Sequence, residues 1–167
     1  MKKRYTIIMW LATLLLLISG TGYAAHVGDL APQFQIRTLS NKVVDSGTLK
    51  GKKSMALIFW ATWCPECKKE IPDIIQLHRE FEPKGMEILA VDVGINDSKA
   101  KVKKYIEKYK VSYPVAFDQG AQITKKFNIQ GTPTIIIVDK NGVIRYRGTH
   151  IPDDLAAHYS QLMEDEE

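Results

Sequence analysis

The chain contains two cysteines, and only two residues separate them in the segment Cys64-Pro65-Glu66-Cys67. A disulfide across so short a loop removes little entropy from the unfolded chain, so stabilising the fold is a weak reason for the pair. Two such cysteines can instead exchange a disulfide, because one thiolate attacks and the other releases the mixed disulfide. The spacing therefore predicts thiol–disulfide chemistry, with Cys64 as the attacking and Cys67 as the resolving cysteine.

A strand and a helix are predicted to position this pair. The continuous apolar run 55–60 is typical of a strand buried on both faces. A helical pattern follows from Cys64 to about Glu82, and Pro72 should kink it because proline lacks an N–H. Cys64 would then lie at the start of a helix, where unpaired N–H groups favour a thiolate.

The remaining pattern alternates strands with helices and predicts an α/β fold, a central mixed β-sheet with helices on both faces. Asn141-Gly142 predicts a type I′ hairpin turn, in which both residues need positive φ. The expected elements are a hairpin over 28–46, a polar connector over 47–53, strands over 87–93, 113–117, 134–138 and 143–147, and helices after Asp97 or Ser98, over 121–127, and from Asp153 to about Met163.

Residues 1–24 have the order of a secretory signal peptide, and residues 25–167 are expected to form the domain. Lys2, Lys3 and Arg4 precede an apolar run over 7–18, and small residues follow as far as Ala24. The alternative is an uncleaved membrane anchor; both place the domain outside the cytoplasm. The three basic residues account for most of the net charge of +4. The nearly neutral domain gives no electrostatic case for nucleic acid.

Three further residues are predicted to bind a substrate peptide. Trp63 would provide a flat apolar platform beside the sulfurs, whereas Trp60 is assigned to the core. Thr132-Pro133 directly precedes the strand 134–138, where a proline fits poorly unless the bond is cis. A cis bond would turn the backbone of Thr132 toward the cysteines as an edge for the substrate.

The segments 60–67 and 131–133 together resemble the thioredoxin superfamily, and Gly28-Asp-Leu-Ala-Pro-Gln-Phe34 resembles its exported TlpA/ResA-type branch. The resemblance implies the thioredoxin fold with an N-terminal β-hairpin and an extra strand–helix insert near 87–117. It also implies a cis Pro133, Cys64 as the exposed nucleophile, and work in cytochrome c maturation. No cofactor and no metal are expected.

Glu70 is a further candidate because of this resemblance. Thioredoxins proper carry a buried aspartate where this chain has Ile58, whereas the exported branch often has a glutamate at the position of Glu70. We expect Glu70 to tune or relay the proton of Cys67. The alternative is a solvated helix glutamate.

The residues between the cysteines favour a reductase. Glu66 places a negative charge beside Cys64, and Pro65 removes one N–H from the helix start. Both features disfavour the Cys64 thiolate. In a strong oxidant, by contrast, the thiolate and therefore the reduced form are unusually stable. The expected partners are disulfide-containing client proteins, apocytochrome c among them, and a membrane thiol electron donor. The protein is expected to be a monomer.

Other functions of the same fold remain open at this point. A peroxiredoxin-type peroxidase would need proline and threonine where the chain has Leu57 and Ala61. A copper or zinc chaperone would need more ligands than two thiolates, and the four histidines show no companion spacing. A thiol oxidase or isomerase is the third alternative. Metal titration of the reduced domain would separate the chaperone from the enzymes.

Overall fold

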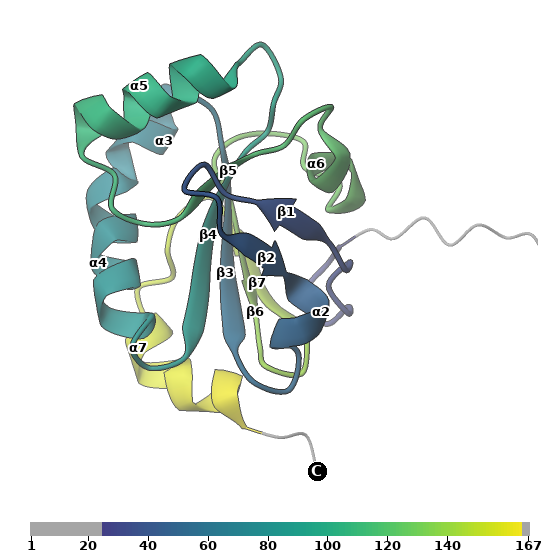
Figure 1. Ribbon diagram of the computed structural model, residues 1–167. Coiled ribbons are helices and arrows are strands. Elements are labelled where there is room, and N and C mark those ends of the chain that lie inside the picture. Colours follow the sequence, from purple (N-terminus) through teal and green to yellow (C-terminus); the bar gives the residue numbers. More distant parts are fainter. Residues whose placement is uncertain (1–24, 165–167) are drawn as a thin grey trace, which may run out of the picture.

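A five-stranded mixed sheet lies at the centre of the computed structural model, which describes residues 25–164 (Figure 1). The strand order is β5–β4–β3–β6–β7; β3 pairs parallel with β4 and β4 with β5, whereas β6 pairs antiparallel with β3 and β7. The predicted mixed sheet is confirmed. The predicted signal peptide lies outside the described residues. The strands are β3 (Ser54–Trp60), β4 (Met86–Asp92), β5 (Val115–Phe117), β6 (Thr134–Val138) and β7 (Ile144–Gly148).

Helices and a hairpin cover the two faces of the sheet. Every residue of β3 and β4 is buried, as expected for inner strands covered on both sides. Successive side chains of β3 point to opposite faces, so Phe59 contacts Phe127 while Trp60 packs against Tyr105. Figure 1 shows α4 and α7 on one side and the hairpin with α2 and α6 on the other. The helices are α2 (Ser46–Leu49), α3 (Pro65–Lys69), α4 (Ile71–Phe81), α5 (Lys99–Tyr109), α6 (Gln122–Lys126) and α7 (Leu155–His158).

The N-terminal hairpin is confirmed, and it consists of β1 (Gln35–Arg37) and β2 (Val43–Asp45) paired antiparallel. The connector after it is more ordered than predicted, because residues 46–49 form α2. The side chain of Asp45 caps this helix by accepting a hydrogen bond from the N–H of Gly47 at 2.9 Å. Asp45 as the N-cap residue therefore explains why a short helix starts here.

The predicted helix from Cys64 to about Glu82 is divided at Glu70 into α3 and α4, although the backbone of Glu70 itself keeps a right-handed helical conformation. Pro72 lies in the first turn of α4, where its missing N–H is not needed. The interruption of the helical segment therefore lies next to Pro72, where the kink was predicted.

The predicted hairpin of β6 and β7 is confirmed, but its turn type and the predicted final helix are wrong. Gly142 has φ 87°, but Asn141 is not in the positive-φ region, so the β6–β7 turn is not type I′. It closes instead with a hydrogen bond from the N–H of Gly142 to the carbonyl oxygen of Asp139. The final helix is two short pieces, α7 and a 3₁₀ helix, η1 (Tyr159–Met163), which bury Leu155 and Leu162.

Candidate active site

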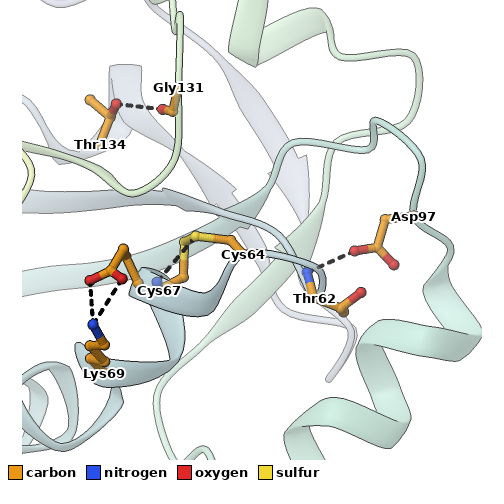
Figure 2. The surroundings of a disulfide bond; sticks show 8 residues. Thr62, Cys64, Cys67, Lys69, Asp97, Gly131 and Thr134 are labelled. Atoms are coloured by element: carbon orange, nitrogen blue, oxygen red, sulfur yellow. Dashed lines mark hydrogen bonds and ion pairs between the residues drawn. A yellow bond between two sulfur atoms is a disulfide. The ribbon is translucent and has the colours of Figure 1, made fainter.

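A disulfide joins Cys64 and Cys67 at the start of α3, with 5.4 Å between the Cα atoms (Figure 2). Cys64 is the N-cap of the helix, and its Sγ accepts a hydrogen bond from the N–H of Cys67 at 3.1 Å. Pro65 occupies the first turn, where it contributes no donor. A donor aimed at Sγ stabilises negative charge there, which favours Cys64 as the attacking thiolate.

Accessibility does not separate the two cysteines in this disulfide-bonded state. Cys64 is 5% exposed and Cys67 is 4% exposed. The assignment of Cys64 as nucleophile therefore depends on its position at the helix N-terminus, and it stays a prediction.

The loop before Cys64 is tied to the β4–α5 loop by three hydrogen bonds. The N–H of Thr62 donates to Oδ2 of Asp97 at 2.8 Å, as Figure 2 shows. The indole N–H of Trp63 donates to the carbonyl oxygen of Ile95 at 2.8 Å. The backbone N–H of Val93 donates to the carbonyl oxygen of Trp60 at 3.0 Å. The active-site loop is therefore held against the end of the sheet, and Asp97 serves this contact while Ser98 caps α5.

Trp63 and Ile95 together form an apolar surface beside the disulfide. Trp63 is 51% exposed and Ile95 is 47% exposed, and the indole hydrogen bond holds them next to one another. Trp60 is buried against Tyr105, as expected for a core residue. An exposed apolar surface of this kind is typical of a binding site.

The Thr132–Pro133 peptide bond is cis, which confirms that prediction. Thr134 pairs with Phe59 in the β3–β6 register, so this turn lies at the same end of the sheet as the active-site loop. The hydroxyl of Thr134 donates to the carbonyl oxygen of Gly131 at 2.7 Å and closes the turn (Figure 2). A role of Thr132 and Pro133 in substrate binding stays a prediction.

Glu66 is exposed and paired with Lys69. Its two carboxylate oxygens lie 2.8 and 2.9 Å from the Lys69 ammonium. The Glu66 side chain is 62% exposed, so solvent also screens its charge. The negative charge that was expected to act on Cys64 is therefore largely compensated.

Glu70 is buried at the junction of α3 and α4. It is 9% exposed, and its Oε1 lies 3.1 Å from Nδ1 of His150. The alternative of a solvated helix glutamate is wrong. His150 was considered at the sequence level only as a metal ligand. It lies 80 residues away along the chain, so nothing in the sequence pattern pairs the two.

Asp92 is a second buried carboxylic acid that the sequence analysis missed. It ends β4 opposite Trp60, is 0% exposed, and accepts a hydrogen bond from the N–H of Gly94 at 2.9 Å. Its Oδ2 has no hydrogen-bond partner among residues 25–164. Burial raises the pKa of Asp92 to about 7, and the neighbouring Asp97 and Asp118 raise it further. The hydrogen bond from the Gly94 N–H acts in the opposite direction. The signal in the sequence was an aspartate within the apolar run 88–93.

Burial alone would also raise the pKa of Asp97, but its hydrogen bonds reverse the direction. The N–H groups of Thr62 and Ser98 donate to its two oxygens at 2.8 Å each. These donors hold the pKa of Asp97 below its usual range. Asp97 is therefore the ionised member of this neighbouring pair, and it anchors the active-site loop.

A cavity of about 720 Å³ lies away from the disulfide. The hairpin side of the sheet forms its floor, with Met55 and Leu57 of β3 and Phe127 after α6, and none of the predicted site residues lines it. Among the residues that the structure describes, no three His, Cys, Asp or Glu side chains are grouped to hold a metal ion. Within the same range, no helix combines the length and hydropathy needed to cross a bilayer.

Comparisons with known proteins agree with this geometry. Residues 27–147 match the AhpC/TSA family. The chain is 31% identical over 175 residues to the thiol-disulfide oxidoreductase ResA of Geobacillus kaustophilus, covering 97% of this chain and 99% of the relative. It is 32% identical over 155 residues to ResA of Bacillus subtilis, covering 86% and 85%.

A solved structure gives the same answer for the fold. The thioredoxin domain of a thiol-disulfide oxidoreductase from Bacteroides vulgatus superposes with a TM-score of 0.70 at 26% identity, covering 83% of this chain and 99% of that domain. The family match, the two relatives and this structure therefore agree on the fold and on the class of chemistry. The chain belongs to the AhpC/TSA family and is a thioredoxin-fold thiol–disulfide oxidoreductase.

Proposed function

We propose that the protein reduces disulfides of client proteins outside the cytoplasm through the dithiol form of Cys64 and Cys67. The observation that carries this proposal is the N-cap position of Cys64, with a backbone N–H on its Sγ, next to the exposed surface of Trp63 and Ile95. This arrangement supports a thiolate that attacks a disulfide on a docked polypeptide.

The exchange proceeds in two steps that balance in atoms and electrons. The Cys64 thiolate attacks one sulfur of the client disulfide, forming a mixed disulfide, and the other client sulfur leaves as a thiolate that takes a proton. Cys67 then loses its proton and attacks Sγ of Cys64, which releases the second client thiol. Two electrons pass to the client, and the protein is left with the Cys64–Cys67 disulfide seen here.

The direction of electron flow is argued from the residues between the cysteines. Pro65 contributes no N–H to the helix start, and Glu66 adds no positive charge, so the thiolate gains less than in a strong oxidant. The ion pair with Lys69 weakens the Glu66 part of the argument. The missing proline donor and the likeness to the ResA proteins therefore carry most of the case for a reductase.

The client and the compartment follow from the TlpA/ResA-type resemblance. Reduction of the haem-binding cysteines of apocytochrome c in cytochrome c maturation fits a protein that accepts an extended polypeptide beside its disulfide. A membrane thiol carrier would restore the dithiol. The basic and apolar order of residues 1–24 supports export by a signal peptide. We expect the protein to act as a monomer.

Trapping of the mixed disulfide tests this function. Cys67→Ser removes the resolving thiol, so the exported variant should accumulate client proteins bound through Cys64, visible as reducible bands on non-reducing gels. The matched control, Cys64→Ser with Cys67 intact, should trap few or none. In the reduced protein, Cys64 should also be alkylated first at neutral pH. Equal trapping by both variants, or faster alkylation of Cys67, would contradict the assignment of roles.

A further inference from the structure

The contact between Glu70 and His150 joins a buried carboxyl group to a solvent-facing imidazole. Glu70 has 12% of its side chain exposed and His150 has 73%, and Nδ1 lies 3.1 Å from Oε1. The imidazole can therefore exchange protons with water while it remains in contact with the carboxyl group. Histidine is the side chain whose charge ordinarily changes between pH 5 and 8.

The backbone of His150 is held by a specific arrangement at the end of β7. The hydroxyl of Tyr146 donates to the carbonyl oxygen of His150 at 2.8 Å. To reach it, the tyrosine ring crosses over Gly148, where an added Cβ would lie 2.1 Å from the hydroxyl oxygen and 2.6 Å from Cζ. A side chain at position 148 would displace the Tyr146 ring, so the glycine allows the hydrogen bond that holds the His150 backbone.

Glu70 is also close to the resolving cysteine. The two residues are three positions apart, and the helical backbone continues through Glu70, with φ −75° and ψ −12°. Positions i and i+3 of a helix share one face, with their Cβ atoms about 5–6 Å apart. Both residues are buried, and the strand position that could offer another carboxyl group is occupied by Ile58. Glu70 therefore shares a helical face with Cys67, in keeping with the expectation that it takes the proton of Cys67.

We propose that His150 is a positioning residue for Glu70: it orients the carboxyl group, and its charge sets how readily Glu70 accepts the Cys67 proton. This inference rests on the proposed function, because it concerns the second step of the same exchange. A protonated imidazole stabilises the Glu70 carboxylate and makes it a weaker base. When the imidazole is neutral, Glu70 takes the proton more readily and Cys67 attacks faster.

The other charged or titratable groups nearby do not provide the same switch. Burial raises the pKa of Tyr146, and the negative charges of Glu70, Asp153 and Asp154 raise it further. Its hydrogen bond to His150 lowers the pKa, but the net direction is upward, so the hydroxyl stays neutral. Lys69 is engaged by Glu66 on the exposed side of α3. Asp153 and Asp154 lie on the chain that follows His150 and add negative charge near Tyr146.

The test is the rate at which Cys67 resolves a preformed mixed disulfide between Cys64 and glutathione, measured from pH 5 to 8. His150→Gln keeps an N–H donor but does not titrate, so the acid limb of the profile should move by about half to one pH unit. His150→Ala loses the orienting contact and should slow resolution about three- to tenfold at neutral pH. In a Glu70→Gln background, both His150 substitutions should have no effect.

His158 provides a matched control on the same C-terminal segment, since its Nδ1 lies 3.4 Å from the exposed carboxylate of Asp154. His158→Gln should leave the profile unchanged. An unaltered profile in His150→Gln, or equal His150 effects with and without Glu70, would overturn the proposal. Because glutathione replaces the client, absence of trapped clients would reject the proposed function while leaving this result intact.

Discussion

Glu70 and Asp92 are both buried carboxylic acids near the active-site loop, but their surroundings differ. Glu70 lies where two helices meet, and the imidazole that contacts it reaches water. Asp92 ends an inner strand, is fully buried, and has one oxygen without a partner among the described residues. Its neighbours Asp97 and Asp118 are also carboxyl groups, and their negative charge raises the pKa of Asp92 further.

The difference separates a carboxyl group suited to proton transfer from one that affects how stability depends on pH. A carboxyl group in contact with a solvent-facing imidazole has a route by which a proton can be exchanged with water. A carboxyl group sealed among other acids instead favours its neutral form, and it affects mainly how stability depends on pH. We therefore expect substitutions at Glu70 to change the kinetics of exchange, and substitutions at Asp92 to change stability.

Asp92→Asn should give the largest effect. The pKa of about 7 in the folded state exceeds the value of 3.8 for an unperturbed aspartate, so the folded protein binds more protons between these values. The wild type should therefore lose stability as the pH rises from about 4 to 7, by about 4 kcal/mol at most from this group. The variant should lack this loss and be more stable at pH 8.

Urea unfolding of both proteins at pH 5 and pH 8 measures this difference. Asp154→Asn is the matched control, since the Asp154 side chain is 69% exposed. Equal loss of stability in the wild type and Asp92→Asn would show that Asp92 does not carry the proton.

Glu70→Gln should give the next largest effect, and of a different kind. The substitution preserves size and a hydrogen bond to His150 but removes the base, so resolution of the mixed disulfide should slow about 10- to 100-fold at neutral pH. Stopped-flow kinetics with glutathione measures this rate. The unfolding free energy should change much less than in Asp92→Asn. A normal rate combined with a large loss of stability would assign Glu70 a structural role instead.

The contrast between these acids also shows what the sequence can predict. The sequence predicts the positions of Cys64, Cys67 and Pro133 because each lies next to a recognisable apolar strand. The two cysteines follow the run 55–60 and the proline precedes the strand 134–138, which places all three at one end of a mixed sheet. The pairing of Glu70 with His150 depends on a contact across 80 residues, and the pKa of Asp92 depends on burial by surrounding strands and loops. Neither leaves a periodic signal in the chain.

The boundaries of elements failed for related reasons. The break at Glu70 depends on how Pro72 starts a second helix, and the conformation of Asn141 depends on the hydrogen bond that closes the turn from Asp139. Each of these details concerns one or two residues. Sequence patterns average over several residues, so they located these segments without resolving the detail.

Glu66→Gln should give the smallest effect, because its charge is exposed and compensated by Lys69. Removing the carboxylate should move the reduction potential toward oxidising values by less than about 15 mV. Lys69→Gln should move it by a similar amount in the opposite direction, and the double variant should return close to the wild type. Redox equilibration with glutathione measures all three. A shift toward reducing values in Glu66→Gln would give the charge argument the wrong sign.

The reduction potential of the Cys64–Cys67 pair in the wild-type protein tests the central claim most directly. It can be read from the fluorescence of the three tryptophans, of which Trp63 is the partly exposed neighbour of the disulfide, across defined glutathione or dithiothreitol ratios. A reductase should have a potential of about −200 to −270 mV, close to that of thioredoxin. A value near −120 mV would identify an oxidant and contradict the proposed direction of electron flow.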